Sequence, residues 1–368
     1  MKNGKKRPQN NGFYPVYGGN GIMDYSNSYN AENTIIVGRV GAYCGCVYKC
    51  DNKCWVSDNA ISVSAKEMVD DQFLYYLMKN LDFHHHHIGG AQPLMTQDII
   101  GDFIVSIPSL LVQRQIASIL KNIDDKIEVN RRINENLEQQ AQALFKSWFV
   151  DFEPFRDGEF VESEMGRIPK GWRVISLEEI AEIAKKLINP QKHFQETFEH
   201  YSIPAFDDGL KPEIQLGEDI KSNKFIVANK MTLFSKLNPR IKRVWYLDNI
   251  GMNAVCSTEF VPYKVKNEAL SSFLYELINS QSFYDYVMSM VNGATSSHQR
   301  FHPEESLKFK IAYNEELVLR YCEATTPIVC QILNNRQESR RLATLRDTLL
   351  PKLMSGELKV NEITTSTI

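Results

Sequence analysis

The sequence lacks an apolar run of the length that crosses a membrane, about 18 residues or more, so we expect no membrane span. Its first residues, MKNGKKRPQNNG, are basic, but no apolar segment follows them, and we do not expect a signal peptide. Seven cysteines in a long chain without a secretory signal are expected to stay reduced. These absences favour a cytoplasmic protein with no membrane partner.

An excess of positive charge is also lacking. The chain has 42 Lys and Arg residues against 45 Asp and Glu residues, a net charge of −3. A protein with this balance binds nucleic acid through local basic patches or together with a basic partner. The hydrophobic content of 43% is ordinary for a folded protein, and 368 residues allow two or three domains.

Motifs of catalysis and cofactor binding are missing as well. There is no G-x-x-x-x-G-K-[ST] loop for nucleotide phosphates, no glycine-rich methyl-donor motif and no acidic cluster of the nuclease type. The Asn/Asp-Pro-Pro-aromatic tetrapeptide of amino-methyltransferases is absent, because Asn189-Pro190-Gln191 and Asn238-Pro239-Arg240 lack the second proline and the aromatic residue. We expect neither catalysis nor a cofactor.

What the sequence does contain is a long amphipathic stretch, residues 112–149, with a second copy at residues 317–353. Its key positions alternate in steps of four and three, a heptad pattern that predicts a coiled coil. The first series is Ile116, Leu120, Ile123, Ile127, Asn130, Asn134, Leu137, Ala141, Leu144 and Trp148. A shift of 205 positions gives Tyr321, Thr325, Ile328, Ile332, Asn335, Ser339, Leu342, Arg346, Leu349 and Leu353. Two long helices with one pattern indicate an internal duplication.

A polar break interrupts both series, at Asn130 and Asn134 in the first and at Asn335 and Ser339 in the second. One interpretation is that buried polar residues fix the register of a helix pair, as a buried Asn does in coiled coils. The other is that Ile133 and its neighbours take over the seam and leave the Asn side chains in solvent. We slightly favour the first.

The duplication extends beyond the helices. Phe73-Leu-Tyr-Tyr-Leu matches Phe273-Leu-Tyr-Glu-Leu, and Gly90-Ala91 matches Gly293-Ala294. The contexts YPVY and YSIP suggest that Tyr14 corresponds to Tyr201. From Pro169 to Tyr201 is a longer stretch than the one ahead of Tyr14, so the first globule is expected to lack an opening segment of roughly 20 residues.

The remaining pattern predicts a strand-rich globule ahead of each long helix. We expect strands at 34–41, 46–48, 55–63 and 102–108 and a helix at 71–80 in the first globule. In the second we expect a helix at 177–186, strands at 224–227, 231–235, 244–247, 254–263 and 307–312, and helical structure over 270–290. The acidic stretch between Asp151 and Gly166, broken by proline and glycine, is typical of a linker.

In this order the motifs resemble the specificity subunits of type I restriction-modification systems, over nearly the whole chain. The resembling stretches are YPVYGGNG (14–21), WVSDNA (55–60), GGAQP (89–93), IPSLLVQRQIASIL (107–120), LFKSWFVDFEPF (144–155), PKGW (169–172), SKLNPRIKRVW (235–245) and LLPKLMSGEL (349–358). The resemblance implies a non-catalytic DNA-reading subunit with two target-recognition domains held apart by an antiparallel helix pair. It also implies double-stranded DNA, two methyltransferase subunits and restriction subunits as partners, in an assembly that methylates adenine N6 and cleaves DNA with ATP.

This resemblance translates into an α+β fold with a pseudo-twofold repeat. The expected layout is a first recognition domain at 1–108, long helix at 109–150, linker at 151–168, second recognition domain at 169–313, second long helix at 314–358 and tail at 359–368. A helix over 112–149 would be about 57 Å long at about 1.5 Å per residue, against about 34–36 Å for a turn of B-DNA. Two different globules at the ends of such a pair predict a bipartite, asymmetric target with an unread spacer.

Candidate DNA contacts come from basic clusters and from polar residues beside glycine loops. Basic clusters usually contact phosphates, whereas Arg reads guanine and Asn or Gln reads adenine. In the first globule the candidates are Lys5, Lys6, Arg7, Tyr17, Asn20, Arg39 and Gln92. In the second they are Lys236, Arg240, Lys242, Arg243, Ser297, Gln299 and Arg300. A solvated surface run is an equal alternative for 2–7, which could be frayed, and Arg39 could instead pair with Asp58.

The alternatives to a specificity subunit are weaker. Cys44, Cys46, Cys50 and Cys54 could hold a structural zinc ion, but their spacing is not that of paired knuckles, and we favour reduced thiols by roughly four to one. The run His84–His87 is better explained as a solvated loop or helix end, because consecutive histidines point in different directions. A zinc-dependent enzyme is therefore the least favoured hypothesis. A truncated, inactive or reserve specificity gene product is the second, and no metal site is expected.

Overall fold

A computed structural model of the chain describes residues 1–8, 11–89, 92–291 and 299–361. The chain divides into two compact units that share two long helices. Unit 1 consists of Met1–Asn130 together with Gln337–Ile368, and unit 2 is Arg131–Arg336. The long helices, α3 (Leu110–Phe149) and α8 (Glu315–Ser355), contribute one part to each unit.

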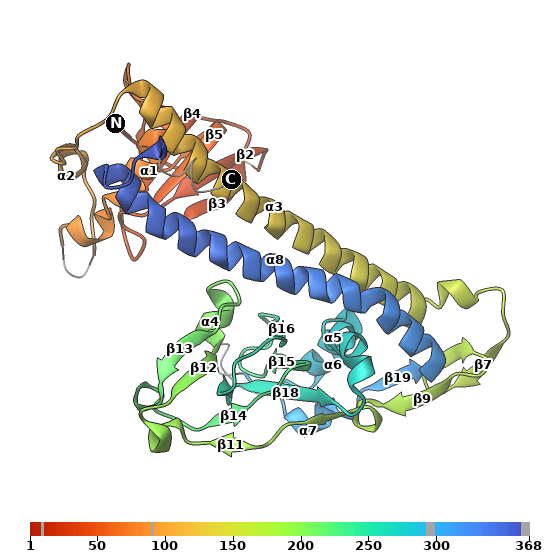
Figure 1. Cartoon of the computed structure of the whole chain (residues 1–368). Coiled ribbons are helices and arrows are strands. Elements are labelled where there is room, and N and C mark those ends of the chain that lie inside the picture. The colour runs from red at the N-terminus through yellow and green to blue at the C-terminus, as the bar shows by residue number, and fades with distance from the viewer. Residues whose placement is uncertain (9–10, 90–91, 292–298, 362–368) are drawn as a thin grey trace. The chain divides into compact units, whose positions relative to one another are not determined.

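Unit 1 is built on a six-stranded sheet in the order β1-β6-β4-β5-β2-β3 (Figure 1). The strands are β1 (Lys2–Asn3), β2 (Tyr14–Gly18), β3 (Gly21–Ser26), β4 (Ala31–Gly38), β5 (Val47–Val56) and β6 (Ala60–Val63). Short helices follow: α1 (Asp71–Asn80), the 3-10 helix η1 (Phe83–His86) and α2 (Gln97–Gly101). Asp70 caps α1, because its carboxylate accepts hydrogen bonds from the amides of Gln72 and Phe73. The N-terminal basic segment is ordered, since β1 pairs with β6.

Unit 2 contains two principal sheets, in the orders β10-β18-β15-β16 and β11-β14-β17-β12-β13, and two small ones, β19-β9 and β7-β8. Its strands are β7 (Phe160–Ser163), β8 (Gly166–Pro169), β9 (Arg173–Ser176), β10 (Ala181–Ile183), β11 (Leu187–Ile188), β12 (Thr197–Tyr201), β13 (Glu213–Leu216), β14 (Lys224–Ile226), β15 (Met231–Ser235), β16 (Val244–Tyr246), β17 (Ala254–Ser257), β18 (Phe260–Val265) and β19 (Lys310–Tyr313). Its shorter α-helices are α4 (Ile203–Asp207), α5 (Ser271–Ile278), α6 (Gln281–Ser289) and α7 (Pro303–Ser306). The 3-10 helices are η2 (Glu153–Phe155), η3 (Leu177–Glu179), η4 (Pro190–His193), η5 (Gly217–Asp219) and η6 (Glu268–Leu270).

Within each unit the long helices pair antiparallel. In unit 1, Arg346 on α8 donates to Asp124 on α3 at 2.7 Å, and Asn130 donates to Ser339 at 3.3 Å. In unit 2, Asn335 donates to Asn134 at 2.8 Å, and Tyr321 donates to the carbonyl of Ala141 at 3.2 Å. In both cases residue numbers rise along α3 as they fall along α8, which is the antiparallel orientation that the resemblance implies.

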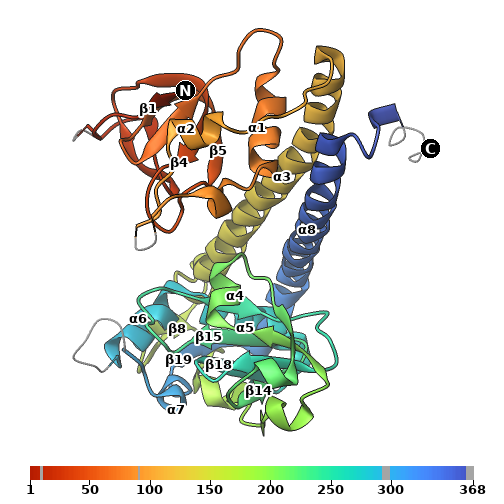
Figure 2. The same ribbon diagram turned by 90° about the vertical axis from the view of Figure 1, so that its left-hand side faces the viewer.

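One short helix fastens the globular part of each unit to the long helices. In unit 1, α1 packs on β5 and places Phe73 and Leu77 against Leu120 of α3 and Leu350 of α8 (Figure 2). In unit 2, α5 packs on β15 and joins a core that includes Phe145 of α3 and Tyr321 of α8 (Figure 1). These are the two copies of the Phe-Leu-Tyr-x-Leu motif. The described residues include no helix with an apolar stretch that could cross a bilayer.

Strand pairing defines which residues of the two units correspond. Gly38 of β4 is opposite Ala60 of β6, and Ser235 of β15 is opposite Phe260 of β18. In the parallel pairs, Tyr17 of β2 is opposite Val56 of β5, and Tyr201 of β12 is opposite Cys256 of β17. Tyr201 of unit 2 therefore corresponds to Tyr17 of unit 1. The correspondence of Tyr201 with Tyr14, which the local sequence suggests, is wrong. The YPVY and YSIP contexts mislead because strand register, not the adjacent proline, sets the position.

Two local predictions of secondary structure were wrong. Residues 103–109 form no strand, although their apolar pattern predicts one. Residues 177–186 form η3 and β10 instead of one helix, because Ser176 and Glu179 form a capping box that starts only a single turn. The stretch expected to be a linker contains η2 and the β7-β8 hairpin, whose turn Gly166 completes at a φ of 88°.

Candidate nucleic-acid interface

Four loops of unit 1 converge at one end of its sheet. At the β2-β3 turn, Gly19 lies so close to β4 that a Cβ added to Gly38 would be 2.7 Å from the Gly19 carbonyl oxygen. At the end of β4, the Arg39 amide donates to the carbonyl of Asn59 in the β5-β6 turn at 2.9 Å. The Gly41 amide donates to the carbonyl of Pro93 at 3.2 Å, which brings in the glycine loop. We call this set of loops edge 1.

Most of the predicted contact residues of unit 1 lie at edge 1. Asn20 and Gln92 are exposed, and Arg39 is half-buried, with its Nη1 3.4 Å from the carbonyl oxygen of Asp58. The pairing of Arg39 is thus with the Asp58 backbone. The structure also brings the N-terminal basic segment here. Lys5 forms a bridge with Ser57, and Lys6 and Arg7 line a hollow of about 300 Å³ with residues 57–59.

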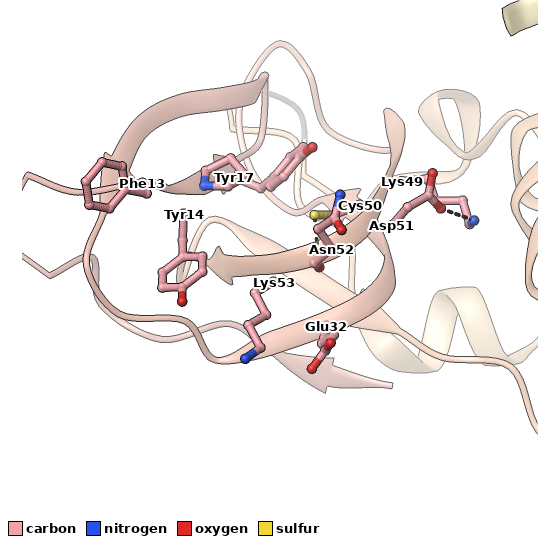
Figure 3. Close-up of a pocket in the computed structure, with 10 residues that line it drawn as sticks. Phe13, Tyr14, Tyr17, Glu32, Lys49, Cys50, Asp51, Asn52 and Lys53 are labelled. Carbon is pink, nitrogen blue, oxygen red and sulfur yellow. Dashed lines mark hydrogen bonds and ion pairs between the residues drawn. The ribbon is translucent and has the colours of Figure 1, made fainter.

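Tyr17 does not lie at this edge as a surface residue. Its side chain is 8% exposed and packs in the core with Cys50, Cys54 and Val56, and burial raises the pKa of its hydroxyl. It forms the inner wall of a separate open pocket of about 560 Å³, which Figure 3 shows with Cys50 beside it. The prediction that Tyr17 contacts bases is not supported, because the register of β2 against β3 shifts between Val16 and Tyr17, and both side chains are buried.

The four clustered cysteines do not form one site. Cys44 packs with Ile35 and Met95 in one core, whereas Cys50 and Cys54 pack in another. Cys50 and Cys54 both lie in β5, and a hydrogen bond from the Cys54 thiol lowers the pKa of Cys50 to about 6. Among the residues that the structure describes, no three His, Cys, Asp or Glu side chains converge as metal ligands. The thiols are free.

The histidine run lies on and just after η1. His84 Nδ1 is 2.9 Å from the carbonyl oxygen of Cys44, and His85 Nε2 is 3.3 Å from the carboxylate of Asp82. The side chains therefore point to different partners, as expected of consecutive residues.

Unit 2 has a corresponding set of loops, which we call edge 2. The Lys236 amide at the end of β15 donates to the carbonyl of Glu259 in the β17-β18 turn at 2.9 Å. The Asn238 amide donates to the carbonyl of Gln299 at 2.9 Å, and the guanidinium of Arg300 donates to both carboxylate oxygens of Glu259 at 3.0 and 3.1 Å. The structure thus assembles Lys236, Gln299 and Arg300 around one turn.

The other predicted residues of unit 2 divide into surface and structural groups. Arg240 is exposed, and its carbonyl accepts a hydrogen bond from the Tyr284 hydroxyl at 3.2 Å. The ammonium of Lys242 donates to the carbonyl of Asn279, and burial lowers its pKa. Gln299 is buried. Ser297 lies outside the described residues.

Arg243 was predicted to contact DNA and has a structural role instead. Its side chain is 8% exposed, and its Nε and Nη2 donate to the two carboxylate oxygens of Asp207 at 2.7 and 2.8 Å. A bidentate pair of this kind commits the buried guanidinium to its partner, whose carboxylate is itself partly exposed. The sequence does not show this, because Asp207 lies far away in the chain.

The same backbone contact organises both edges. Arg39 to Asn59 in unit 1 and Lys236 to Glu259 in unit 2 occupy corresponding strand ends and have the same hydrogen-bond length, 2.9 Å. Sequence reasoning missed the turns that carry Asn59 and Glu259 as parts of the edges. The signal was available, because Val56-Ser57 and Cys256-Ser257 precede these turns at matching positions.

The polar break of the coiled coil is buried. In unit 2, Asn134 and Asn335 are bonded to each other, and Asn134 also donates to the carbonyl of Ile332 at 3.1 Å. In unit 1, Asn130 donates to Glu338 at 2.7 Å and to Ser339. Ile133, the residue that would otherwise take over the seam, is exposed. This geometry is that of a paired polar layer and not of solvated side chains.

Comparisons with known proteins agree with this architecture. Residues 2–139 match the family model described as the type I restriction modification DNA specificity domain. The chain is 28% identical over 323 residues to the specificity subunit of the type I restriction enzyme MjaIX of Methanocaldococcus jannaschii, covering 82% of this chain and 72% of the relative. It is 26% identical over 332 residues to the HindI specificity subunit of Haemophilus influenzae, covering 73% and 72%.

The fold also has a counterpart among solved structures. The S subunit of the type I restriction-modification system of M. genitalium matches with a TM-score of 0.58 at 17% identity, over 96% of this chain and 92% of that one. Residues 2–139, which include edge 1, match a DNA specificity domain of such systems. The chain is therefore similar to the specificity subunits of type I restriction-modification systems over most of its length.

Proposed function

We propose that the chain selects a bipartite DNA sequence for a type I restriction-modification complex and supplies no catalysis itself. The observation that carries this is the pair of edges. Each edge is built by the equivalent backbone hydrogen bond, but the two edges carry different side chains. Edge 1 presents Arg39, Asn20 and Gln92, and edge 2 presents Lys236 and Arg300. Because the two edges differ, we infer two different half-sites and an asymmetric target.

The side chains at the two edges are of the kinds that recognise bases and contact phosphates. Arg recognises guanine and Asn or Gln recognises adenine through paired hydrogen bonds in the major groove. Lysines contact phosphates and add salt-dependent affinity without base choice. Arg300 is held by Glu259, so we infer that it exchanges that partner for DNA or orients the turn.

The net charge of −3 implies that partners supply part of the affinity. We infer that two methyltransferase subunits dock on α3 and α8 and that restriction subunits join them, as in the family. The complex would methylate adenine N6 and cleave DNA with ATP. We place it in the cytoplasm, where these partners and the DNA are.

The decisive measurement is methylome sequencing of the host with and without this gene. We expect one bipartite methyl-adenine motif to disappear, with an unread spacer between unlike half-sites. Retention of every methylated motif in the deletion strain contradicts the proposal.

Point variants assign the half-sites. Lys236→Ala should weaken methylation of one half-site and reduce the salt slope of binding by about one, as loss of one phosphate contact does. Lys230→Ala, at the opposite end of β15 and away from edge 2, is the matched control. Arg39→Ala should relax base choice at the other half-site. Equal effects of Lys236→Ala and Lys230→Ala would argue against edge 2 as the DNA surface.

The helices can be tested as the element that sets the spacer. Both α3 and α8 run through both units, so we insert seven residues after Asn130 and seven after Arg336. Two turns add about 10 Å, which corresponds to about three base pairs. The spacer should lengthen with both half-sites unchanged. A change in the half-site bases themselves contradicts this role.

A further inference from the structure

Two cysteines that the candidate interface does not use meet inside unit 1. Cys50 and Cys54 are four residues apart in β5, where a regular strand would separate their Cα atoms by about 13 Å. Thiols at that separation cannot touch. In this structure the two side chains nevertheless form a hydrogen bond and share one core with Tyr17. A local departure from strand geometry must therefore bring them together.

A bulge in β5 provides that departure. The pairing of β5 with β4 runs from Cys50 opposite Thr34 to Lys53 opposite Glu32. Between these pairs, two residues of β5 face a single residue of β4. The carbonyl oxygen of Asn52 lies 3.3 Å from the Cys50 sulfur, so the bulge bends back toward this side chain. Because a bulge bends its strand, it brings the thiols on its two flanks within reach of each other.

Cys50 lies at the wall of an open pocket, and Cys54 lies behind it. The pocket of about 560 Å³ is lined by Cys50 and its neighbours in β5 together with Tyr14 and Tyr17 of β2 (Figure 3). Cys50 is 5% exposed and Cys54 is 0% exposed. A small reactant can therefore reach the first thiol from the pocket, whereas the second is shielded from it.

The contacts of Cys50 favour its ionised form, and cysteine reacts as the thiolate. The hydrogen bond from the Cys54 thiol has the largest influence and lowers the pKa of Cys50 to about 6. Burial opposes this, and the Tyr17 hydroxyl donates a second hydrogen bond that acts in the same direction as the first. The bond between the thiols, together with burial, raises the pKa of Cys54. The charge therefore rests on the thiol at the pocket and the proton on the thiol behind it.

We propose that Cys50 is a site of oxidation by hydroperoxides and that Cys54 converts the product into a disulfide. The Cys50 sulfur attacks one peroxide oxygen, an S–O bond forms as the O–O bond breaks, and the hydroxide or alkoxide that leaves takes a proton from water. Cys50 is then a sulfenic acid. The Cys54 sulfur attacks the Cys50 sulfur, an S–S bond forms as the S–O bond breaks, and the departing hydroxide takes the Cys54 proton and leaves as water. The peroxide is reduced by two electrons, and the pair of thiols is oxidised by two.

Cys44 is the matched control within the same segment of the chain. It is 0% exposed, packs with Ile35 and Met95 in a different core, and has its pKa raised by burial. It therefore shares the burial of the pair, but its environment disfavours the thiolate. The proposal concerns the reactivity of the folded chain and does not rest on the proposed function.

The test treats the full-length protein with hydrogen peroxide and reads each cysteine by alkylation and peptide mass spectrometry. We expect a disulfide between Cys50 and Cys54 to form while Cys44 stays reduced. Cys54→Ser should instead accumulate sulfenic acid at Cys50, which dimedone traps. Cys50→Ser should give neither product, and Cys44→Ser should oxidise as the native chain does.

The pH profile of alkylation tests the roles of the neighbouring groups. In the native chain the reaction of Cys50 with iodoacetamide should be half-maximal near about pH 6. Cys54→Ala removes the hydrogen bond that holds the thiolate, so the midpoint should rise toward about 8.5, the ordinary value for cysteine, and the rate at the native midpoint should fall at least about tenfold. Tyr17→Phe should move the profile in the same direction by less.

Three results contradict the proposal. They are oxidation of Cys44 as fast as that of Cys50, loss of the thiols to peroxide without a disulfide between Cys50 and Cys54, and an alkylation profile that Cys54→Ala leaves unchanged. Amide exchange across β4, β5 and β6 shows whether each variant is folded, and the comparison of Cys50 with Cys44 in the native chain needs no variant. Because no DNA or partner subunit is present, failure here leaves the proposed function untouched.

Discussion

The two units fasten to the long helices by the same apolar residues but by different polar ones. Phe73 and Phe273 are each 1% exposed, and Leu77 and Leu277 are buried behind them. Between them, Tyr76 of unit 1 corresponds to Glu276 of unit 2. Tyr76 donates to Asp124 at 2.7 Å, and Asp124 in turn accepts from Arg346 at 2.7 Å. Glu276 accepts a hydrogen bond from Gln142 on α3.

The comparison shows that duplication retained the apolar spacing and replaced the polar contact. Unit 1 has a chain of complementary groups, a hydroxyl, a carboxylate and a guanidinium. Unit 2 has instead buried a carboxyl group, and this burial raises the pKa of Glu276 to about 8. Apolar packing holds both units on the helices, while the polar contact makes their responses to pH differ.

The largest expected effect comes from removing either aromatic anchor. Phe273→Ala should lower the free energy of unfolding of unit 2 by about 3–5 kcal/mol, the range for a buried Phe. Phe73→Ala should likewise lower the free energy of unfolding of unit 1. The loss caused by Phe273→Ala should be the larger of the two, because Phe273 also contacts the rings of Phe149 and Tyr321. Amide exchange read separately in each unit measures this. If either variant loosened both units equally, the units would not be independent.

Glu276→Gln should remove a pH dependence that belongs to unit 2. Desolvation raises the Glu276 pKa; the Gln142 hydrogen bond and Lys242 oppose the rise, and Glu138 adds to it. Between about pH 4.5 and pH 8 the folded protein keeps a proton that the unfolded chain loses. Stability should therefore fall as pH rises through this interval and level off above it.

At pH 8 the Gln variant should be more stable than the native chain by a few kcal/mol, since each pKa unit is about 1.4 kcal/mol. Denaturation of both proteins across this pH range gives the slope. Glu316→Gln, on the exposed face of α8, is the control and should leave the slope intact. A slope shared by Glu276→Gln and the native chain contradicts the assignment.

The polar layer offers a smaller contrast. Asn134→Ala should cost about 1–3 kcal/mol, because it leaves the buried amide of Asn335 without this partner. Asn130→Ala should cost less, since Glu338 is exposed and can turn to solvent. Urea denaturation of the two variants compares them. The reverse order would mean that the layer in unit 1 is the more tightly coupled one.

Tyr76→Phe is the mildest change. It removes one hydrogen bond to Asp124 while keeping the ring, and should lower the stability of unit 1 by about 1 kcal/mol. Asp124 retains Arg346 as a partner. We expect the midpoint of denaturation to fall and the dependence of the unfolding free energy on denaturant to keep its slope. No change in midpoint would show that the apolar anchor alone fastens α1.

Much of the architecture could be predicted because it depends on periodicity. The heptad series, the α1 motif at Asp71–Asn80 and strands such as β15 follow directly from spacing. What could not be predicted depends on partners far away in the chain. Residues 103–109 have strand sequence but no adjacent strand, and Arg243 has a basic side chain but is buried against the carboxylate of Asp207.

The candidate interface shows the same division. Glycine loops and polar residues identify Asn20, Arg39 and Gln92, and the structure brings their loops together. Tyr17 is buried instead, next to a shift in the register of β2 between Val16 and Tyr17 that the sequence does not show. The role of each remaining residue in reading DNA stays a prediction.

The sharing of the long helices also dictates an order of assembly. Unit 2 is one continuous segment, Arg131–Arg336, whereas the core of unit 1 joins Ile116 and Leu120 to Leu350 and Leu353 near the other end of the chain. During synthesis, unit 2 can therefore close before the last residues of α8 emerge. Unit 1 has to wait for them, with Phe73, Tyr76 and Leu77 uncovered meanwhile. The unit whose sheet is made first thus completes its core last, and the apolar face of α1 is open to aggregation until then.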